Sequence, residues 1–87
     1  MKIYRHKQFK KHYNRLPTKI QDKVNTTLNR FKLNPFDPVL NNHSLSGYLK
    51  DKNSISVTGD IRIIFEEYDD YTLVLMLDVG SHSQLYD

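Results

Sequence analysis

The apolar residues of this 87-residue chain change their spacing halfway along, and that change restricts the fold more than any other feature. In the first half they recur every three to four residues, which is typical of one face of a helix. The first such run, residues 7–16, places on one face Phe9, Tyr13 and Leu16. The second, residues 18–32, has an apolar stripe of Ile20, Val24, Leu28 and Phe31. The prolines of "NPFDP" (34–38) end this helical pattern.

The second half shows the alternation of β-strands. "GYLKDKNSISV" (47–57) predicts two strands or one bent strand, and "TGD" (58–60) predicts a turn. "DIRIIFEEY" (60–68) predicts a strand with Arg62 on the face opposite Ile61, Ile63 and Phe65. "TLVLMLDVG" (72–80) is apolar on both faces, as in a central strand. Simple alternation places Val79 with Leu73, Leu75 and Leu77, and Asp78 with Val74 and Met76.

A further short strand, "MKIYRH" (1–6), precedes the helices, and "SHSQLYD" (81–87) allows at most one helical turn. We therefore predict one α+β domain over residues 1–87, because a chain of this length forms a single small domain. The N-terminal strand and the helical hairpin pack on one face of a mainly antiparallel sheet. The other face stays uncovered, and Arg62 projects onto it.

Charge is distributed unevenly along the chain. Residues 1–34 hold ten lysines and arginines and one acid, whereas residues 35–87 hold three basic residues and nine acids. The basic front favours a polyanionic partner. The alternative is a lysine-coated helix surface that only keeps the protein soluble.

The absence of cysteines fits a reducing compartment. No run reaches the length of a membrane span, and the N-terminus lacks the apolar core of a signal peptide. We therefore expect a cytoplasmic protein without a membrane partner. The four histidines are too scattered to form a metal cluster, and the chain has no glycine-rich phosphate loop.

Arg62 is the first chemical candidate, because a guanidinium among isoleucines needs a partner. That partner is either a carboxylate, with Asp78 suitably placed, or a phosphate bound by the planar fork. His82, after a strand-ending glycine, is suited to proton transfer near neutral pH. Tyr86 lies four residues later, on the same face of a helical turn, where it either caps the core or stacks on a base.

Three further residues are weaker candidates. His43 lies in "NNHSLSG", before the strands of the second half. Lys50 and Lys52 share one face if residues 47–57 form a strand, and they are either phosphate ligands or ordinary solvated lysines.

The order and spacing of these pieces resemble the RelE/ParE superfamily of bacterial type II toxin–antitoxin toxins, and its YafQ-like messenger-RNA interferases in particular. The motifs are "HSLSG", "GDIRIIF" and "GSHSQLY", and the resemblance covers nearly the whole chain. It implies a toxin that enters the ribosomal A site and cuts messenger RNA there. It also implies neutralisation by a cognate antitoxin. The chemistry implied needs no metal or other cofactor: a ribose 2′-hydroxyl attacks the adjacent phosphate.

The resemblance also implies site residues. His82 would transfer a proton, His43 would be a second acid or base, and Arg62 would stabilise phosphate charge. Tyr86 would orient the nucleotide and Asp60 would orient a histidine. Lysines of RelE-type toxins match Lys50 and Lys52, which would bind substrate. Ribosomal RNA would meet the basic helix residues Lys7, Lys10, Lys11, Lys19, Lys23 and Arg30.

This chain departs from both branches. The YafQ-like toxins have a further histidine where this chain has Ser56, and the RelE type has a C-terminal arginine where it has only His82. Two alternatives therefore remain. One is a ParE-like protein that inhibits DNA gyrase by binding alone, against which the "GSHSQLY" ending argues. The other is a catalytically inactive relative that acts as a binding partner.

Overall fold

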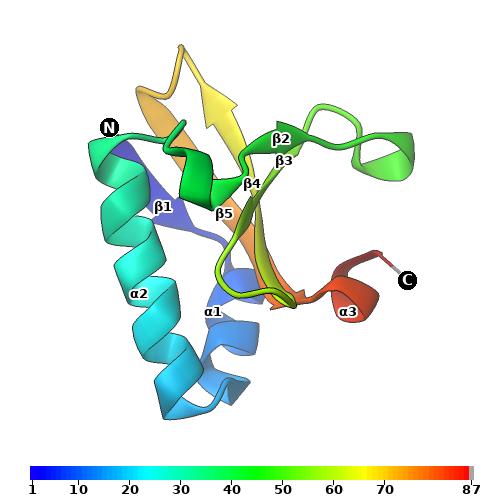
Figure 1. Cartoon of the computed structure of the whole chain (residues 1–87). Helices are drawn as coiled ribbons and strands as arrows, with labels where there is room; N and C mark the ends of the chain where they lie inside the picture. The colour runs from blue at the N-terminus through cyan, green and yellow to red at the C-terminus, as the bar shows by residue number, and fades with distance from the viewer. Residues whose placement is uncertain (87) are drawn as a thin grey trace.

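A five-stranded sheet separates a pair of helices from the C-terminal turn of the chain (Figure 1). The structure is a computed structural model and describes residues 1–86. The strands follow the order β1-β5-β4-β3-β2 across the sheet. Only β1 is parallel to its neighbour, so the sheet is mainly antiparallel as predicted. The strands are β1 (Lys2–Arg5), β2 (His43–Ser44), β3 (Asn53–Ser56), β4 (Ile61–Tyr68) and β5 (Leu73–Ser81).

Helices α1 (Lys7–Arg15) and α2 (Thr18–Leu33) cover one face of the sheet, which confirms the predicted α+β layering. The His6 side chain caps α1 by accepting the Gln8 N–H at 3.0 Å. The last helix, α3 (His82–Tyr86), lies beyond β5 on the opposite side of the sheet (Figure 1). Two short 3-10 helices, η1 (Pro38–Leu40) and η2 (Gly47–Leu49), lie in the connection between α2 and β3.

The core forms between the helical hairpin and the sheet. The stripe residues Phe9, Val24, Leu28 and Phe31 are buried there, while Tyr13, Leu16 and Ile20 pack at its edge. Phe31 meets Phe65 edge to face, with ring centroids 5.0 Å apart. The sheet contributes residues with side chains on its helix-covered face: Ile55, Ile63, Phe65, Val74, Met76 and Val79.

Strand β5 contains a bulge that sequence alternation did not predict. Phe65 pairs with Met76 and Ile64 pairs with Asp78, so Leu77 is an extra residue. The bulge reverses the facing of everything after it. Val79 therefore joins Met76 in the core, and its predicted place beside Leu77 is wrong. Asp78 instead lies beside the uncovered face.

The segment before β3 also differs from the prediction. Gly47–Leu49 is a 3-10 turn and only Asn53–Ser56 is a strand, so Lys50 and Lys52 do not share a strand face. Gly47 has φ +68°, which favours glycine, and Asp51 follows at φ 72°. These left-handed residues fold the segment back over the sheet instead of extending it.

Gly80 is the β5 partner of Arg62 and lies beneath α3. A Cβ atom there would approach Gln84 Oε1 to 2.9 Å and a Leu85 methyl carbon to 3.6 Å. That Gln84 oxygen accepts the Ser81 N–H at 2.8 Å, which holds the start of α3 to the end of β5. Glycine at this position therefore allows α3 to pack closely against the strand.

We predict that Phe31→Ala lowers the free energy of unfolding by about 3–5 kcal/mol, because it leaves a cavity at the helix–sheet interface. Urea denaturation measures this loss. The control is Leu33→Ala, since Leu33 is 89% exposed and its truncation should cost less than about 0.5 kcal/mol. Equal losses in the two variants would contradict the assignment of the core.

We predict that Gly80→Ala speeds amide hydrogen exchange at Ser81 about 10-fold, because the new methyl group displaces the Gln84 oxygen that protects this N–H. The matched control is Gly59→Ala, where a Cβ meets nothing within 4 Å. Unchanged protection of Ser81 in Gly80→Ala would show that α3 does not depend on close packing there.

Candidate functional site

Four of the predicted site residues line one cavity on the face of the sheet away from the helical hairpin. The cavity, called here the Arg62 cavity, has a volume of about 390 Å³. Its predicted members are His43, Arg62, His82 and Tyr86, which come from β2, β4 and α3. The remaining lining residues are Asn41, Leu45, Ser46 and Leu49. Residues as far apart in sequence as His43 and His82 thus line one cavity.

Arg62 donates from Nη1 to Ser56 Oγ at 2.6 Å, across the β3–β4 pair. Asp78, the carboxylate considered from the sequence, pairs with His12 instead, at 2.6 Å between Nδ1 and Oδ1. No ion pair within residues 1–86 involves Arg62. The guanidinium is thus oriented by a neutral hydroxyl and keeps its positive charge for a ligand, because a hydroxyl cannot neutralise it.

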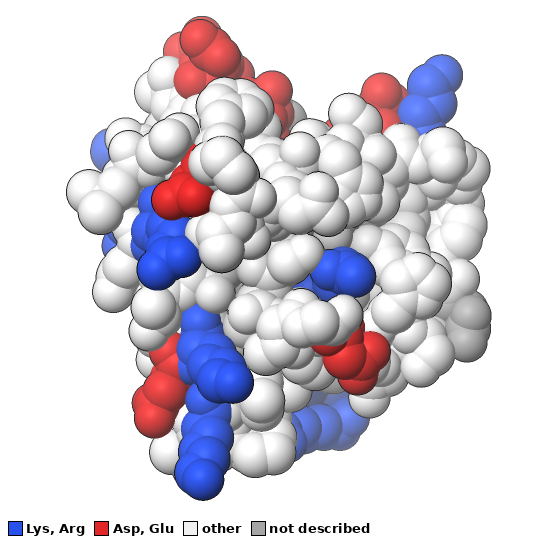
Figure 2. Space-filling model, viewed as in Figure 1, with Lys and Arg blue, Asp and Glu red and all other residues white. Residues whose placement is uncertain are grey.

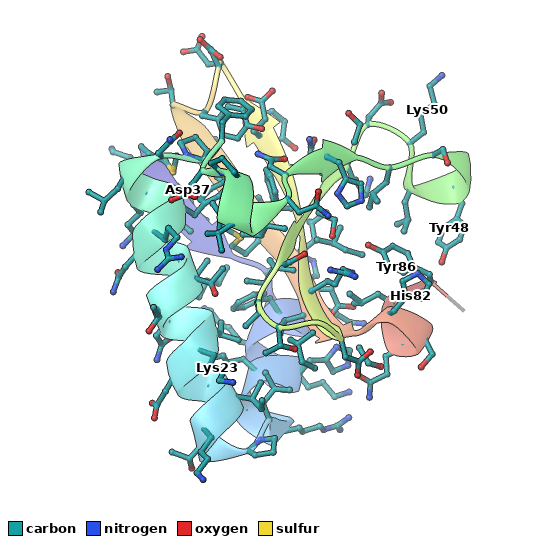
Figure 3. The ribbon with its side chains drawn as sticks, viewed as in Figure 1. Lys23, Asp37, Tyr48, Lys50, His82 and Tyr86 are labelled. Carbon is teal, nitrogen blue, oxygen red and sulfur yellow. The ribbon has the colours of Figure 1, made fainter. Side chains whose placement is uncertain are left out.

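His82 and Tyr86 stand side by side on α3, with ring centroids 4.6 Å apart (Figure 3). The Tyr86 hydroxyl donates to Ser54 Oγ at 3.2 Å, and Ser54 is fully buried in β3. This bond ties the end of α3 to the sheet. His82 itself is exposed, so its imidazole is accessible to a substrate in the Arg62 cavity.

His43 lies in β2, paired with Ser54 of β3. Its Nδ1 is 2.8 Å from the Asn41 carbonyl oxygen. A carbonyl only accepts hydrogen bonds, so Nδ1 carries the proton and, in the neutral ring, Nε2 has a free lone pair. The neighbouring Asn42 amide donates to Pro35 O at 3.0 Å and to Tyr71 Oη at 3.1 Å. The segment that presents His43 is therefore well anchored.

Three predicted residues lie apart from this group. Asp60 is exposed in the turn before β4, where its backbone N–H donates to Thr58 Oγ1 at 3.2 Å. Lys50 is exposed on the side of its loop away from the His82–Tyr86 pair (Figure 3). Lys52 Nζ contacts Glu66 Oε1 at 3.2 Å. None of the three lines the Arg62 cavity, and their roles stay predictions.

The acidic "EEYDD" segment divides between strand and turn. Glu66 and Glu67 belong to β4, and Asp69 and Asp70 form the turn to β5. A hydrogen bond from the Tyr68 hydroxyl lowers the pKa of Glu66, and Lys52 lowers it further, against a burial effect that raises it. Figure 2 shows acidic atoms at the top of the molecule, where Figure 1 places the turn between β4 and β5, and neither Asp69 nor Asp70 lines the Arg62 cavity.

The basic residues predicted to meet ribosomal RNA are all exposed on the two long helices. Figure 2 shows lysine and arginine atoms following α2 down one side of the molecule, and Lys23 projects from α2 in Figure 3. The exposed set is Lys7, Lys10, Lys11, Lys19, Lys23 and Arg30.

Sequence reasoning missed the loop residues of the cavity and the His12–Asp78 pair. Leu45, Ser46 and Leu49 reach the cavity because η2 and its flanking turns fold back over the sheet. Their only sequence signal was Gly47, whose positive φ makes this fold possible. The His12–Asp78 pair depends on the β5 bulge and has no local signal.

Within residues 1–86, no group of three or more histidine, cysteine or acidic side chains is placed to hold a metal ion. Over the same residues, no helix has the length and apolarity that crossing a membrane requires.

Comparison with solved structures shows the same fold in known toxins. YafQ from Escherichia coli strain BL21(DE3) is similar, with TM-score 0.79 and 21% identity over 98% of this chain and 97% of that one. A copper-bound mutant toxin from Helicobacter pylori has TM-score 0.73 and 26% identity over 99% of each chain. The E. coli DinJ–YafQ complex has TM-score 0.70 and 24% identity over 98% of this chain and 97% of that one.

No curated protein matches the sequence. The family described as the YafQ bacterial toxin of type II toxin–antitoxin systems, however, matches all of it, residues 1–87. The whole-chain match agrees with the α+β fold and with the motifs that meet around Arg62. The chain therefore belongs to the YafQ family of bacterial toxins of type II toxin–antitoxin systems.

Proposed function

We propose that this toxin is an endoribonuclease that cuts messenger RNA in the ribosomal A site, in the cytoplasm, with residues 1–87 acting as one domain. The observation that carries the proposal is the Arg62 cavity. A guanidinium without an ion-pair partner in residues 1–86 shares it with two imidazoles and an aromatic ring. These groups match the needs of phosphodiester cleavage, which are a base, an acid and positive charge on the phosphate.

The proposed reaction begins when a base removes the proton of the ribose 2′-hydroxyl. The 2′-oxygen bonds to the adjacent phosphorus, and the bond from phosphorus to the 5′-oxygen breaks. An acid gives a proton to that 5′-oxygen, so the products are a 2′,3′-cyclic phosphate and a 5′-hydroxyl. Charge builds up on the non-bridging oxygens, and Arg62 stabilises it with its remaining N–H donors.

We assign the base to His43 and the acid to His82. The Asn41 carbonyl fixes the His43 proton on Nδ1, so Nε2 is free to accept a proton. His82 faces the same cavity from α3 and supplies the leaving-group proton. Tyr86 packs against His82 and orients the nucleotide, and the exposed basic residues of α1 and α2 contact ribosomal RNA.

We further propose that a cognate antitoxin protein neutralises this toxin. The E. coli YafQ of the DinJ–YafQ complex, 24% identical to this chain, is bound to its partner in that complex.

We predict that His82→Ala slows messenger-RNA cleavage on programmed ribosomes at least 100-fold, because the leaving oxygen loses its proton donor. A message with sulfur in place of the bridging 5′-oxygen should restore most of the rate, since a thiolate leaves without protonation. His43→Ala should be equally slow and not restored by sulfur. The control Ser83→Ala changes the neighbouring exposed residue and should cut normally. Restoration of both histidine variants, or of neither, would contradict the assignment.

We predict that Arg62→Lys loses at least 10-fold in kcat with a smaller change in KM, because lysine keeps the charge but not the planar fork. Cleavage kinetics on programmed ribosomes measure both constants.

Mapping of transcript ends after expression of the toxin tests whether messenger RNA is cut at all. Intact messages together with inhibited DNA supercoiling would show a gyrase inhibitor instead. Intact messages and normal growth without antitoxin would show an inactive binding partner.

A further inference from the structure

A second cavity lies on the same face of the sheet, next to the Arg62 cavity. It has a volume of about 360 Å³ and is called here the Ile64 cavity. Leu49 lines both cavities, so the two are neighbours across the η2 loop. The lining residues of the second are His6, Gln8, Tyr48, Leu49, Lys52, Ile64, Leu77, Asp78 and Leu85.

The Ile64 cavity combines apolar side chains with a few polar ones. Ile64 and Leu85 are buried but lie outside the core between sheet and helices. Leu77 faces away from the buried Met76 by ordinary strand alternation, and the β5 bulge brings Asp78, which follows it, to the same side. Gln8 and Asp78 add polar atoms. Apolar surface with a few polar groups that fix orientation is typical of a small-molecule or base site.

Tyr48 closes one side of this cavity. Tyr48 as a residue is 75% exposed, and its hydroxyl donates to the Leu85 carbonyl oxygen at 3.3 Å. Figure 3 shows the Tyr48 ring directed from its loop toward the side of α3 that carries His82 and Tyr86. An exposed ring held by its hydroxyl presents a flat surface for stacking, which is worth about 1–3 kcal/mol for each stacked base.

Asp78 has one oxygen that the protein itself does not use. Its Oδ1 accepts the His12 Nδ1 proton at 2.6 Å and the Val79 N–H at 2.8 Å. Within residues 1–86, Oδ2 has no hydrogen-bond partner, although the side chain is only 22% exposed. In that described part of the chain, no side-chain oxygen or nitrogen is both buried and without a partner, so Oδ2 is in contact with solvent and is free to accept a donor from a ligand.

We infer that the Ile64 cavity binds a nucleobase that bears an exocyclic amino group, from the nucleotide next to the phosphate held by Arg62. The inference rests on the proposed function. The base stacks on Tyr48, its apolar faces meet Ile64 and Leu77, and its amino group donates to Asp78 Oδ2. A carboxylate accepts from the cytosine N4 amino group but has no donor for uracil O4. At the position of Asp78 the Ile64 cavity therefore favours cytosine over uracil.

Binding of 2′-O-methyl trinucleotides tests this inference without cleavage, because the methyl group blocks attack by the 2′-oxygen. CCC and UUU are the probes, since cytosine and uracil differ mainly in the edge that Asp78 reads. The wild-type toxin should bind CCC about 10-fold more tightly than UUU. Asp78→Asn keeps an oxygen for His12 and places an amide donor at the Oδ2 position. It should reduce the CCC/UUU ratio to about one.

Matched controls separate base recognition from charge and folding. Asp22→Asn removes one negative charge from an exposed site on α2 and should keep the wild-type ratio. Tyr48→Ala should weaken both trinucleotides about 10-fold, whereas Tyr4→Ala, at an exposed tyrosine of β1, should weaken neither. Thermal melting checks that each variant is folded. If Asp78→Asn is not, Gln8→Ala takes its place and should weaken CCC binding.

Three outcomes are distinguishable. Equal binding of CCC and UUU by the wild-type protein would overturn the inference, whether or not messenger RNA is cut. A toxin that does not cut but keeps a ratio dependent on Asp78 would overturn the proposed function and support the base site. If Tyr48→Ala and Asp78→Asn bind RNA normally but lose the antitoxin, the cavity receives a protein side chain and the inference is wrong.

Discussion

The Arg62–Ser56 hydrogen bond is the interaction on which the site depends. A guanidinium among isoleucines needs a hydrogen-bond partner. A carboxylate partner would also neutralise its positive charge, and the group would then bind a phosphate only weakly. A serine hydroxyl 2.6 Å away orients the group and leaves its charge intact. Gly80, opposite Arg62 on β5, lets α3 approach and bring His82 and Tyr86 to the same cavity. We propose a catalytic role for Arg62 because no carboxylate within residues 1–86 forms an ion pair with it.

Much of the fold could be predicted because the sequence is periodic. Local spacing of apolar residues predicted the helix stripes that contain Phe9 and Phe31 and the strand alternation around Ile63. All three residues are buried in the core. Only the order of the motifs gave a reason to expect Arg62, His43 and His82 at one site, because no local sequence pattern shows which loops meet. In the structure all three line the Arg62 cavity. The resemblance therefore supplied four of the residues that line the Arg62 cavity, but not the arrangement of their side chains or the loop residues beside them.

The errors have a common physical origin. The β5 bulge at Leu77 and the η2 turn after Gly47 each break a regular strand, and simple alternation assumes that strands are regular. Both irregularities face the open side of the sheet. The bulge brings Asp78 there with one oxygen unused, and the turn brings Tyr48 and Leu49 over it. The features that sequence reasoning missed are the ones that shape the two cavities.

Nitrogen NMR of the arginine side chains tests the central claim most directly. Signals of Arg62 would be followed while a 2′-deoxy trinucleotide, which cannot react, is added to the toxin. We predict a saturable shift of the Arg62 guanidinium signals, with the same dissociation constant as shifts of the His43 and His82 rings. Arg62 signals that stay constant while the trinucleotide binds elsewhere would contradict it.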